Sequence, residues 1–175
     1  MRAVIVGCGR VGATMAQVLD VAGHEVTIVD LLTRSFDRLP ATFGGNAVRG
    51  DGTDEDTLRR AGAERADLFL ALTEGDNRNV MAAQLAVEAL AIGRVFAKVN
   101  DPVRAQAYAE LGIGTICRTT MMADALLAVL GQAGGGEPSI REGEGHPHGA
   151  APVAAVAAAG SSTAVAAATA PTREG

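Results

Sequence analysis

Short apolar runs alternate with longer amphipathic segments along roughly the first 130 residues of the chain. The runs are rich in β-branched residues, which is typical of strands covered on both faces, and the segments between them carry apolar residues at helical spacing. The predicted strands are Ala3–Val6, Glu25–Val29, Ala47–Arg49, Leu68–Leu72, Arg94–Val99 and Ile113–Cys117. The predicted helices are Val11–Val21, Arg34–Leu39, Asp54–Arg60, Arg78–Ala91, Pro102–Leu111 and Met121–Leu130.

This alternation predicts an α/β fold, a Rossmann-like doubly wound parallel sheet of six strands in the order 3-2-1-4-5-6. Three helix starts have readable signals. Thr53 with Asp56 resembles a capping box, Thr119 is a suitable cap for the last helix, and Pro102 suits a first helical turn because it lacks an N–H.

The pattern stops after Gln132. Residues 134–175 open with Gly134–Gly136 and contain no leucine and no aromatic residue. Small and polar side chains bury too little apolar surface to offset the entropy lost on ordering. We therefore predict a folded domain at residues 1–133 and a low-complexity Gly/Ala/Pro-rich disordered tail at residues 134–175.

The composition fits this division and excludes some partners. Hydrophobic residues make up 48% of the chain but aromatic residues only 3%. The formal net charge is −5, which argues against broad electrostatic capture of nucleic acid. The two cysteines, Cys8 and Cys117, cannot form a disulfide framework.

Targeting and membrane signals are not visible in the sequence. Met1-Arg2 runs directly into the first predicted strand, without the apolar segment and cleavage site of a signal peptide. No stretch of about 18 apolar residues is free of Gly, Pro and charge. We therefore expect a cytoplasmic protein without direct membrane insertion.

The strongest chemical signal is the stretch Gly7–Gly12, with the sequence GCGRVG, directly after the first predicted strand. In such a turn the first glycine permits tight bending, the second lets the backbone approach a phosphate, and the third allows close helix–strand packing. The following helix N-terminus offers free N–H groups to an anion. Asp30, at the end of the second predicted strand, stands where an acidic side chain binds the adenosine ribose hydroxyls.

Asp30 and Arg10 bear on which nucleotide would bind. A carboxylate at Asp30 repels a 2′-phosphate, so NADP is disfavoured. Arg34 could in principle pair with that phosphate, but the favoured interpretation of Arg34 is a solvated residue at the start of a helix. Arg10 is placed to pair with a terminal phosphate of ATP or ADP, or with the NAD pyrophosphate. An exposed Arg10, and a cap or surface role for Asp30, are the alternatives. NAD(H) and ATP/ADP both remain open.

These residues belong to a longer series of motifs that resembles the nucleotide-binding domain of the RCK/KTN (TrkA-N) family, the cytosolic regulators of potassium channels and Trk/Ktr-type uptake systems. The order and spacing of the motifs agree over residues 1 to about 130, so the resemblance makes residues 1–133 the RCK N-terminal domain. The matching stretches are Val4–Gly12, His24–Asp30, Gly50–Asp54, Ala66–Asp67, Leu72–Asn79 and Lys98–Pro102.

The resemblance implies a role for each motif residue. The glycines and Arg10 would line the phosphates, Asp30 the ribose, Asp51 the adenine and Thr73 the rest of the nucleotide, and Lys98 would reach a phosphate or a neighbouring subunit. The implied cofactor-binding set is Gly7, Gly9, Arg10, Val11, Gly12, Asp30, Asp51, Thr73 and Lys98.

Several of these residues also have a purely structural interpretation. Asp51 would then serve only its turn, and Lys98 would be an edge residue with its stem over apolar surface. Asp76 and Asn79 look more like cap and first-turn residues of the following helix than ligands.

The family resemblance implies a non-enzymatic regulatory subunit that gates a potassium transporter or channel through a ligand-dependent change of subunit geometry. The helix Met121–Leu130 carries more apolar residues than one buried face needs, and in the family such a helix crosses onto a partner subunit. A homodimer or a larger ring is therefore expected. The protein would lie in the cytoplasm, at the inner face of the membrane through its membrane partner.

The sequence departs from the family pattern in two places, and two alternative functions remain open. Nothing after residue 133 resembles the second, ligand-binding subdomain of many relatives, and Ile116–Thr120 has no acidic residue of the kind that holds a metal in some ATP-binding relatives, so no metal site is expected. One alternative is an NAD-dependent oxidoreductase, but no catalytic residue is predicted: His24 lies far from the site, and His146 and His148 lie in the tail. The other is a truncated subunit that acts only by hetero-assembly.

Overall fold

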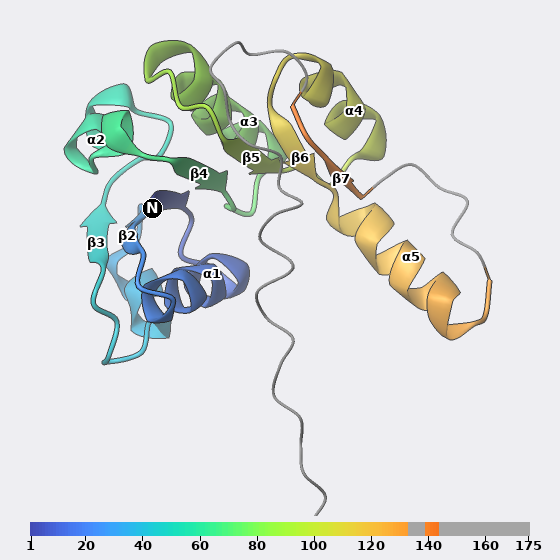
Figure 1. Ribbon diagram of the computed structural model, residues 1–175, viewed down its shortest axis with the longest axis horizontal. Helices are drawn as coiled ribbons and strands as arrows, with labels where there is room; N and C mark the ends of the chain where they lie inside the picture. The colour runs from blue at the N-terminus through green and yellow to red at the C-terminus, as the bar shows by residue number, and fades with distance from the viewer. Residues whose placement is uncertain (133–138, 144–175) are drawn as a thin grey trace, which may run out of the picture.

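The computed structural model of the chain describes residues 1–132 and 139–143, which contain a seven-stranded sheet in the order β3-β2-β1-β4-β5-β6-β7 (Figure 1). A short strand, β7 (Ile140–Arg141), pairs antiparallel with its neighbour, and the other pairings are parallel. The parallel strands are β1 (Arg2–Val6), β2 (Glu25–Asp30), β3 (Asn46–Arg49), β4 (Leu68–Ala71), β5 (Val95–Lys98) and β6 (Gly114–Ile116). The order of these six confirms the predicted doubly wound sheet.

Both faces of the sheet are covered, which is why its central strands are apolar throughout. Along β1, Val4 and Val6 join one apolar cluster, while Ala3 and Ile5 point to the opposite face and join another. The first cluster is covered by α2 (Glu55–Arg60), η2 (Ala63–Arg65), α3 (Asp76–Gln84), η3 (Leu85–Ala89) and α4 (Pro102–Glu110). The second is covered by α1 (Arg10–Val21) and η1 (Thr33–Arg38).

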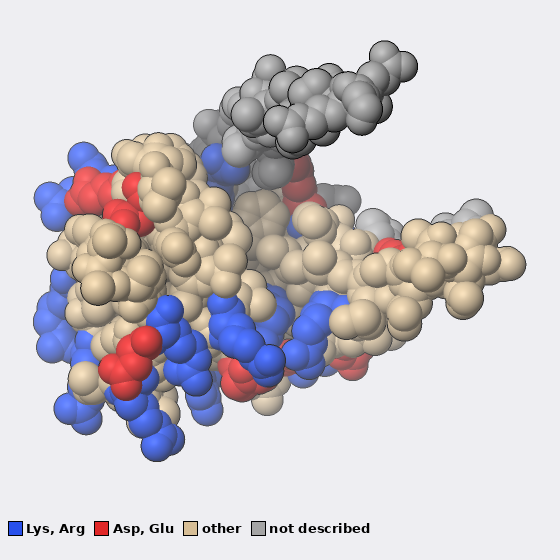
Figure 2. Space-filling view, turned by 90° about the horizontal axis from the view of Figure 1, so that it is seen from below, with Lys and Arg blue, Asp and Glu red and all other residues tan. Residues whose placement is uncertain are grey.

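The last helix, α5 (Arg118–Val129), projects away from this body (Figure 1). None of its residues is buried, and among the described residues no other helix or strand packs extensively against it. On the face that Figure 2 shows, the projecting helix at the right carries few charged side chains. Its exposed apolar residues are Met121, Met122, Leu126 and Val129. The sequence predicted this excess of apolar residues, and the structure leaves it uncovered.

Strand β7 corrects the prediction of six strands and of a tail without structure from residue 134 onward. Ile140 pairs with Ile116 and Arg141 with Thr115, and the Cys117 N–H donates to the Ser139 carbonyl at 2.8 Å. A two-residue strand is held by backbone hydrogen bonds, which any residue can form, so no hydropathy pattern in the sequence predicts it. The rest of the predicted tail lies outside the described residues, and the boundary at residue 133 stays a prediction.

Two of the three predicted helix starts are wrong. Asp54, not Thr53, caps α2, and its Oδ2 accepts from the Thr57 N–H at 3.0 Å and from the Thr57 hydroxyl at 2.6 Å. Helix α5 begins at Arg118, so Thr119 lies inside its first turn. Aspartate and threonine are both good N-cap residues, so the sequence alone does not decide which of two neighbouring residues begins the helix. Pro102 begins α4, as predicted.

Two predicted helices differ in their geometry. Thr33–Arg38 forms a 3₁₀-helix, and the predicted helix Arg78–Ala91 divides into α3 and a π-helical turn at Leu85–Ala89. In that turn the Leu90 N–H donates to the Leu85 carbonyl at 3.1 Å. Hydrophobic periodicity cannot separate these helix types over a single turn. None of the described helices combines the length and the hydropathy that a membrane crossing requires.

Candidate functional site

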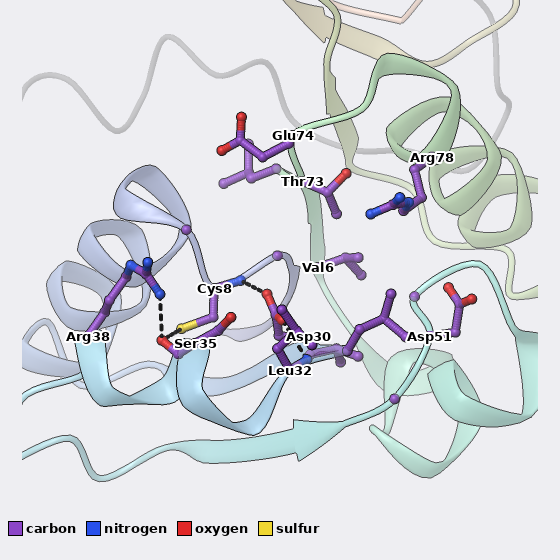
Figure 3. Close-up of a pocket in the computed structure, with 17 residues that line it drawn as sticks. Val6, Cys8, Asp30, Leu32, Ser35, Arg38, Asp51, Thr73, Glu74 and Arg78 are labelled. Carbon is purple, nitrogen blue, oxygen red and sulfur yellow. Dashed lines mark hydrogen bonds between the residues drawn. The ribbon is translucent and has the colours of Figure 1, made fainter.

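A pocket of about 340 Å³ lies at the carboxyl ends of β1, β2, β3 and β4 (Figure 3). It opens where the strand order reverses between β1 and β4, the place where ligands bind in open α/β sheets. Its walls come from the connections that follow these four strands, including the loop Gly7–Gly9 and the loop Gly50–Gly52. Sequence reasoning placed its candidate residues after β1, β2, β3 and β4, apart from Lys98 at the end of β5.

The glycines of the first loop have different surroundings. A Cβ on Gly12 would lie 1.9 Å from the Gly7 carbonyl oxygen, and one on Gly7, whose φ is +102°, would lie 2.8 Å from the Thr73 nitrogen. The nearest atom to a Cβ on Gly9 is a carboxylate oxygen of Glu74, at 3.9 Å. Gly7 and Gly12 are therefore required by packing, whereas Gly9 leaves open space beside the backbone.

Asp30 holds this loop in place. Its Oδ2 accepts from the Cys8 N–H at 2.8 Å, and its Oδ1 accepts from the Leu32 N–H at 2.9 Å. The side chain also lines the pocket, and each carboxylate oxygen keeps a further lone pair for a hydroxyl donor. Asp30 therefore braces the loop and keeps acceptor capacity facing the pocket.

Cys8, within the loop, is a buried neutral thiol. Burial raises the pKa of Cys8 to about 11, with a further contribution from the charge of Asp30, while Arg38 opposes the shift. The thiol donates to the Ser35 carbonyl at 3.2 Å. Because a nucleophilic cysteine needs its thiolate, Cys8 serves as a packing and hydrogen-bonding residue here.

Asp51 lies on the pocket wall opposite the first loop (Figure 3). Its Oδ1 accepts from both the N–H and the hydroxyl of Thr53, at 2.9 and 2.8 Å. The flanking glycines are tightly packed: a Cβ on Gly50 would lie 2.4 Å from a Thr57 carbon, and one on Gly52 would lie 2.1 Å from a Val6 carbon. The Asp51 side chain therefore stabilises the turn to Thr53 by hydrogen bonds and also lines the pocket.

Thr73 lines the pocket but uses its donors inside the protein. Its N–H and its hydroxyl both donate to Asn79 Oδ1, each at 2.7 Å. The fully buried Asn79 amide in turn donates to the carbonyls of Thr73 and Lys98, at 3.1 and 2.9 Å. Asn79 is thus a structural residue that joins the ends of β4 and β5 to α3, in line with its alternative interpretation.

Four predicted site residues do not line the pocket. Arg10 and Val11 are exposed on the first turn of α1, and Gly12 packs against Gly7 behind the loop. Lys98 is buried at the end of β5. The structure therefore brings together Gly7, Gly9, Asp30, Asp51 and Thr73, and ligand binding by the other four stays a prediction.

Two arginines that sequence reasoning missed also line the pocket. Figure 3 shows Arg38 and Arg78 on opposite sides of it. Ser35 and Arg38 both face the pocket because residues three apart share one side of a 3₁₀-helix, and that geometry selects Arg38 rather than Arg34. Arg78 lies within the motif stretch Leu72–Asn79 and was the easier of the two to find.

The pocket therefore offers several groups to a phosphorylated ligand. They are the N-terminus of α1, the carboxylates of Asp30 and Asp51, and two guanidinium groups. Within residues 1–132 and 139–143, no group of three or more His, Cys, Asp and Glu side chains is placed to hold a metal ion.

Comparison with known proteins identifies relatives of the chain. Residues 3–119 match the family model of the TrkA-N domain. The Trk system potassium uptake protein TrkA of Streptomyces coelicolor is 45% identical over 145 residues, which cover 83% of this chain. The chain spans 65% of the length of that relative.

Solved structures share the fold at lower identity. The TrkA-N domain of the Escherichia coli inner membrane protein ybaL superposes with a TM-score of 0.66 at 19% identity, covering 74% of this chain and 96% of that domain. The Shewanella denitrificans Kef C-terminal domain, in its AMP-bound form, superposes with a TM-score of 0.60 at 22% identity, covering 77% of this chain and 84% of that one.

Proposed function

The chain belongs to the TrkA-N domain family, and on that premise we propose that it is a nucleotide-binding regulatory subunit of a potassium-uptake system. The observation that carries the proposal is the pocket at the reversal of strand order, whose glycine loop is braced by Asp30. The 45% identity to a potassium uptake protein supports the choice of transport system.

The proposed ligand is an adenine nucleotide, either NAD(H) or ATP/ADP. The Gly7–Gly9 backbone and the N-terminus of α1 would receive its phosphates, and the free lone pairs of Asp30 would receive its ribose hydroxyls. Asp51 would lie beside the adenine. The charge of Asp30 disfavours NADP, because it would repel a 2′-phosphate.

Regulation would follow from a difference in affinity between two arrangements of the subunits. A nucleotide that binds one arrangement more tightly shifts the population toward it, and the shift is limited by that difference. The uncovered apolar side of α5 supports pairing with a second copy, as a homodimer or within a larger ring. The assembly would act from the cytoplasm on the membrane subunit of the potassium transporter or channel.

Binding is tested by thermal shift and calorimetry with ATP, ADP, AMP, NAD⁺, NADH and NADPH in parallel. At least one of the first five should stabilise the protein, and NADPH should bind more weakly than NADH. Asp30→Asn loses the charge and one of the two acceptor oxygens that hold the Cys8 and Leu32 N–H groups, so it should weaken binding about tenfold or more. The matched control is Asp37→Asn, because Asp37 is exposed on η1 and does not line the pocket. Equal loss in both variants, or no stabilisation by any nucleotide, would contradict the proposal.

We propose a binding role rather than catalysis, in keeping with the 45% identity to a potassium uptake protein. The alternative, an NAD-dependent oxidoreductase, predicts hydride transfer between nicotinamide and an alcohol or hydroxy acid. Measurable turnover by the purified chain, followed as NADH absorbance, would favour the enzyme.

A further inference from the structure

We propose that three linked residues, Asp76, Asn100 and Thr119, transmit occupancy of the nucleotide pocket to the orientation of helix α5. The inference rests on the proposed nucleotide site and adds the route of its regulation. The route consists of side-chain and backbone hydrogen bonds between three segments that are far apart in the sequence.

The route begins at the pocket wall formed by Thr73 and Glu74. Two residues further on, Asp76 is the first residue of α3, so the wall and the aspartate share one short, continuous piece of backbone. Gly7 packs directly beneath this piece, because a Cβ there would meet the Thr73 nitrogen at 2.8 Å. A ligand in the pocket would lie against Thr73 and Glu74, two residues before Asp76.

Asp76 holds the connection between β5 and α4 by two hydrogen bonds. Its Oδ2 accepts from the Asn100 backbone N–H at 2.9 Å, and its Oδ1 accepts from the Asn100 side-chain amide at 2.7 Å. A bidentate contact to a carboxylate fixes both the position and the orientation of Asn100. Movement of Asp76 is thereby passed to Asn100.

Asn100 in turn holds the first turn of α5. Its carbonyl oxygen accepts from the Thr119 hydroxyl at 2.6 Å and from the Cys117 thiol at 3.5 Å. This explains why Thr119 does not cap its own helix: its hydroxyl is used to attach the helix to the body. The first turn of α5 is thus tied to the same residue that Asp76 holds.

The attachment at one end makes α5 sensitive to small movements. None of its residues is buried, so little else opposes a change of tilt. Twelve residues form a rod about 18 Å long, and a tilt of about 10° at its root would move its far end by about 3 Å. Because the exposed apolar residues lie along this rod, such a movement would change how two copies meet.

One buried atom of the connection between β5 and α4 has no hydrogen-bond partner among the described residues. Asn100 Oδ1 is buried and accepts no hydrogen bond within the described residues. A buried acceptor without a donor raises the free energy of the arrangement that contains it.

The test is Thr119→Val in the full chain, because valine keeps the branched shape and removes only the hydroxyl. The matched control is Thr120→Val, since the Thr120 hydroxyl donates to the Cys117 carbonyl and does not contact Asn100. Thr119→Ser restores a hydroxyl and serves as the rescue variant. Each protein is measured by calorimetry and by hydrogen–deuterium exchange of α5, with and without ATP, ADP and NADH in separate experiments.

In the wild type and in the Thr120→Val and Thr119→Ser variants, the bound nucleotide should change amide exchange in α5 by about fivefold or more, the range of ordinary allosteric coupling. In Thr119→Val the change should fall below about twofold, while the dissociation constant stays within about threefold of the wild-type value. A lost exchange response with an unchanged dissociation constant distinguishes a residue that transmits occupancy from one that only supports the pocket.

Each other result overturns a defined part of the proposal. A wild-type protein that binds nucleotide without any change in α5 refutes the route but leaves the binding site standing. The same is true if Thr119→Val responds like the wild type, or if Thr120→Val loses the response equally. A wild type that binds none of ATP, ADP, AMP, NAD⁺ and NADH refutes the proposed function, and the proposed route is then refuted as well.

Discussion

Glycines three positions apart in one loop meet different physical demands at the residue scale. The Cβ of an alanine at position 12 would overlap the backbone carbonyl of Gly7, and neither atom belongs to a flexible side chain. An alanine at position 9 would instead project into open space with an ordinary backbone conformation, since its φ is −79°. One glycine is therefore needed for folding and the other for access.

Gly12→Ala should lower the free energy of unfolding by about 3 kcal/mol, the upper range for overpacking. Gly9→Ala should change it by less than about 1 kcal/mol but weaken nucleotide binding about tenfold, because the methyl group takes the space of a phosphate. Urea unfolding and calorimetry measure the two effects. Equal loss of stability in both variants would show that Gly9 is also a packing residue.

Cys8 gives the free energy of unfolding a dependence on pH. Its folded-state pKa is about 11, against an ordinary value of 9.0, so the unfolded chain releases the proton first as the pH rises. The stabilising contribution is complete below pH 9 and is lost between pH 9 and about 11, by a total of about 2 kcal/mol. Urea titrations across this range should show the decline in the wild type and a smaller one in Cys8→Ala. Parallel declines would contradict the assignment.

At the scale of the element, the π-helical turn after α3 ends in an unusual conformation. Ala91 has a φ of +52°, the left-handed region that favours glycine. Ala91→Gly should therefore raise the free energy of unfolding by about 1 kcal/mol. Ala89→Gly, on the exposed side of the same turn, should lower it by about 1 kcal/mol, because glycine is a poor helix former. Chemical denaturation checks both signs, and a loss of stability in both variants would refute the role of Ala91.

Elements with a long hydrophobic pattern were predicted well, and elements held by a few hydrogen bonds were not. The strands covered on both faces, such as β1 and β4, have apolar runs that no loop would carry. The two-residue strand β7 has no such run, and only the approach of Ser139 to Cys117 creates it. The 3₁₀ geometry of Thr33–Arg38 was missed for a similar reason, because it depends on local packing.

At the scale of the whole molecule, α5 is the feature that the isolated chain leaves uncovered (Figures 1 and 2). Leu126 is 57% exposed and Val129 is 85% exposed, on a helix without buried residues. Apolar side chains gathered on one exposed element are typical of an interface. We therefore expect a second copy of the chain to cover them.

Leu126→Glu should convert the assembly to single chains of 17.7 kDa, whereas the wild type should have at least twice that mass. The melting temperature of the body should change little, because α5 contributes no buried residue to it. Val103→Glu is the matched control, since Val103 is 79% exposed on α4 rather than α5. Light scattering at micromolar concentration measures the masses. A wild type of single-chain mass would contradict the expected assembly.

The sequence by itself determined the six parallel strands, their order and the edge of the sheet at which the pocket lies. Apolar runs specify strands through burial, parallel connections leave few topologies, and a glycine loop followed by Asp30 marks one edge of the sheet. These features are local or periodic, so they can be read along the chain. Five of the nine predicted site residues line the pocket for this reason.

Only the tertiary structure decided which side chains meet across the pocket and beyond it. Arg38 faces the pocket because of a 3₁₀ turn, and the Thr73 hydroxyl donates to Asn79 rather than toward the pocket. The link from Asp76 through Asn100 to Thr119 joins residues 24 and 19 positions apart. Such contacts depend on the distances between atoms in the folded chain, and no pattern of hydrophobic and polar positions contains that information.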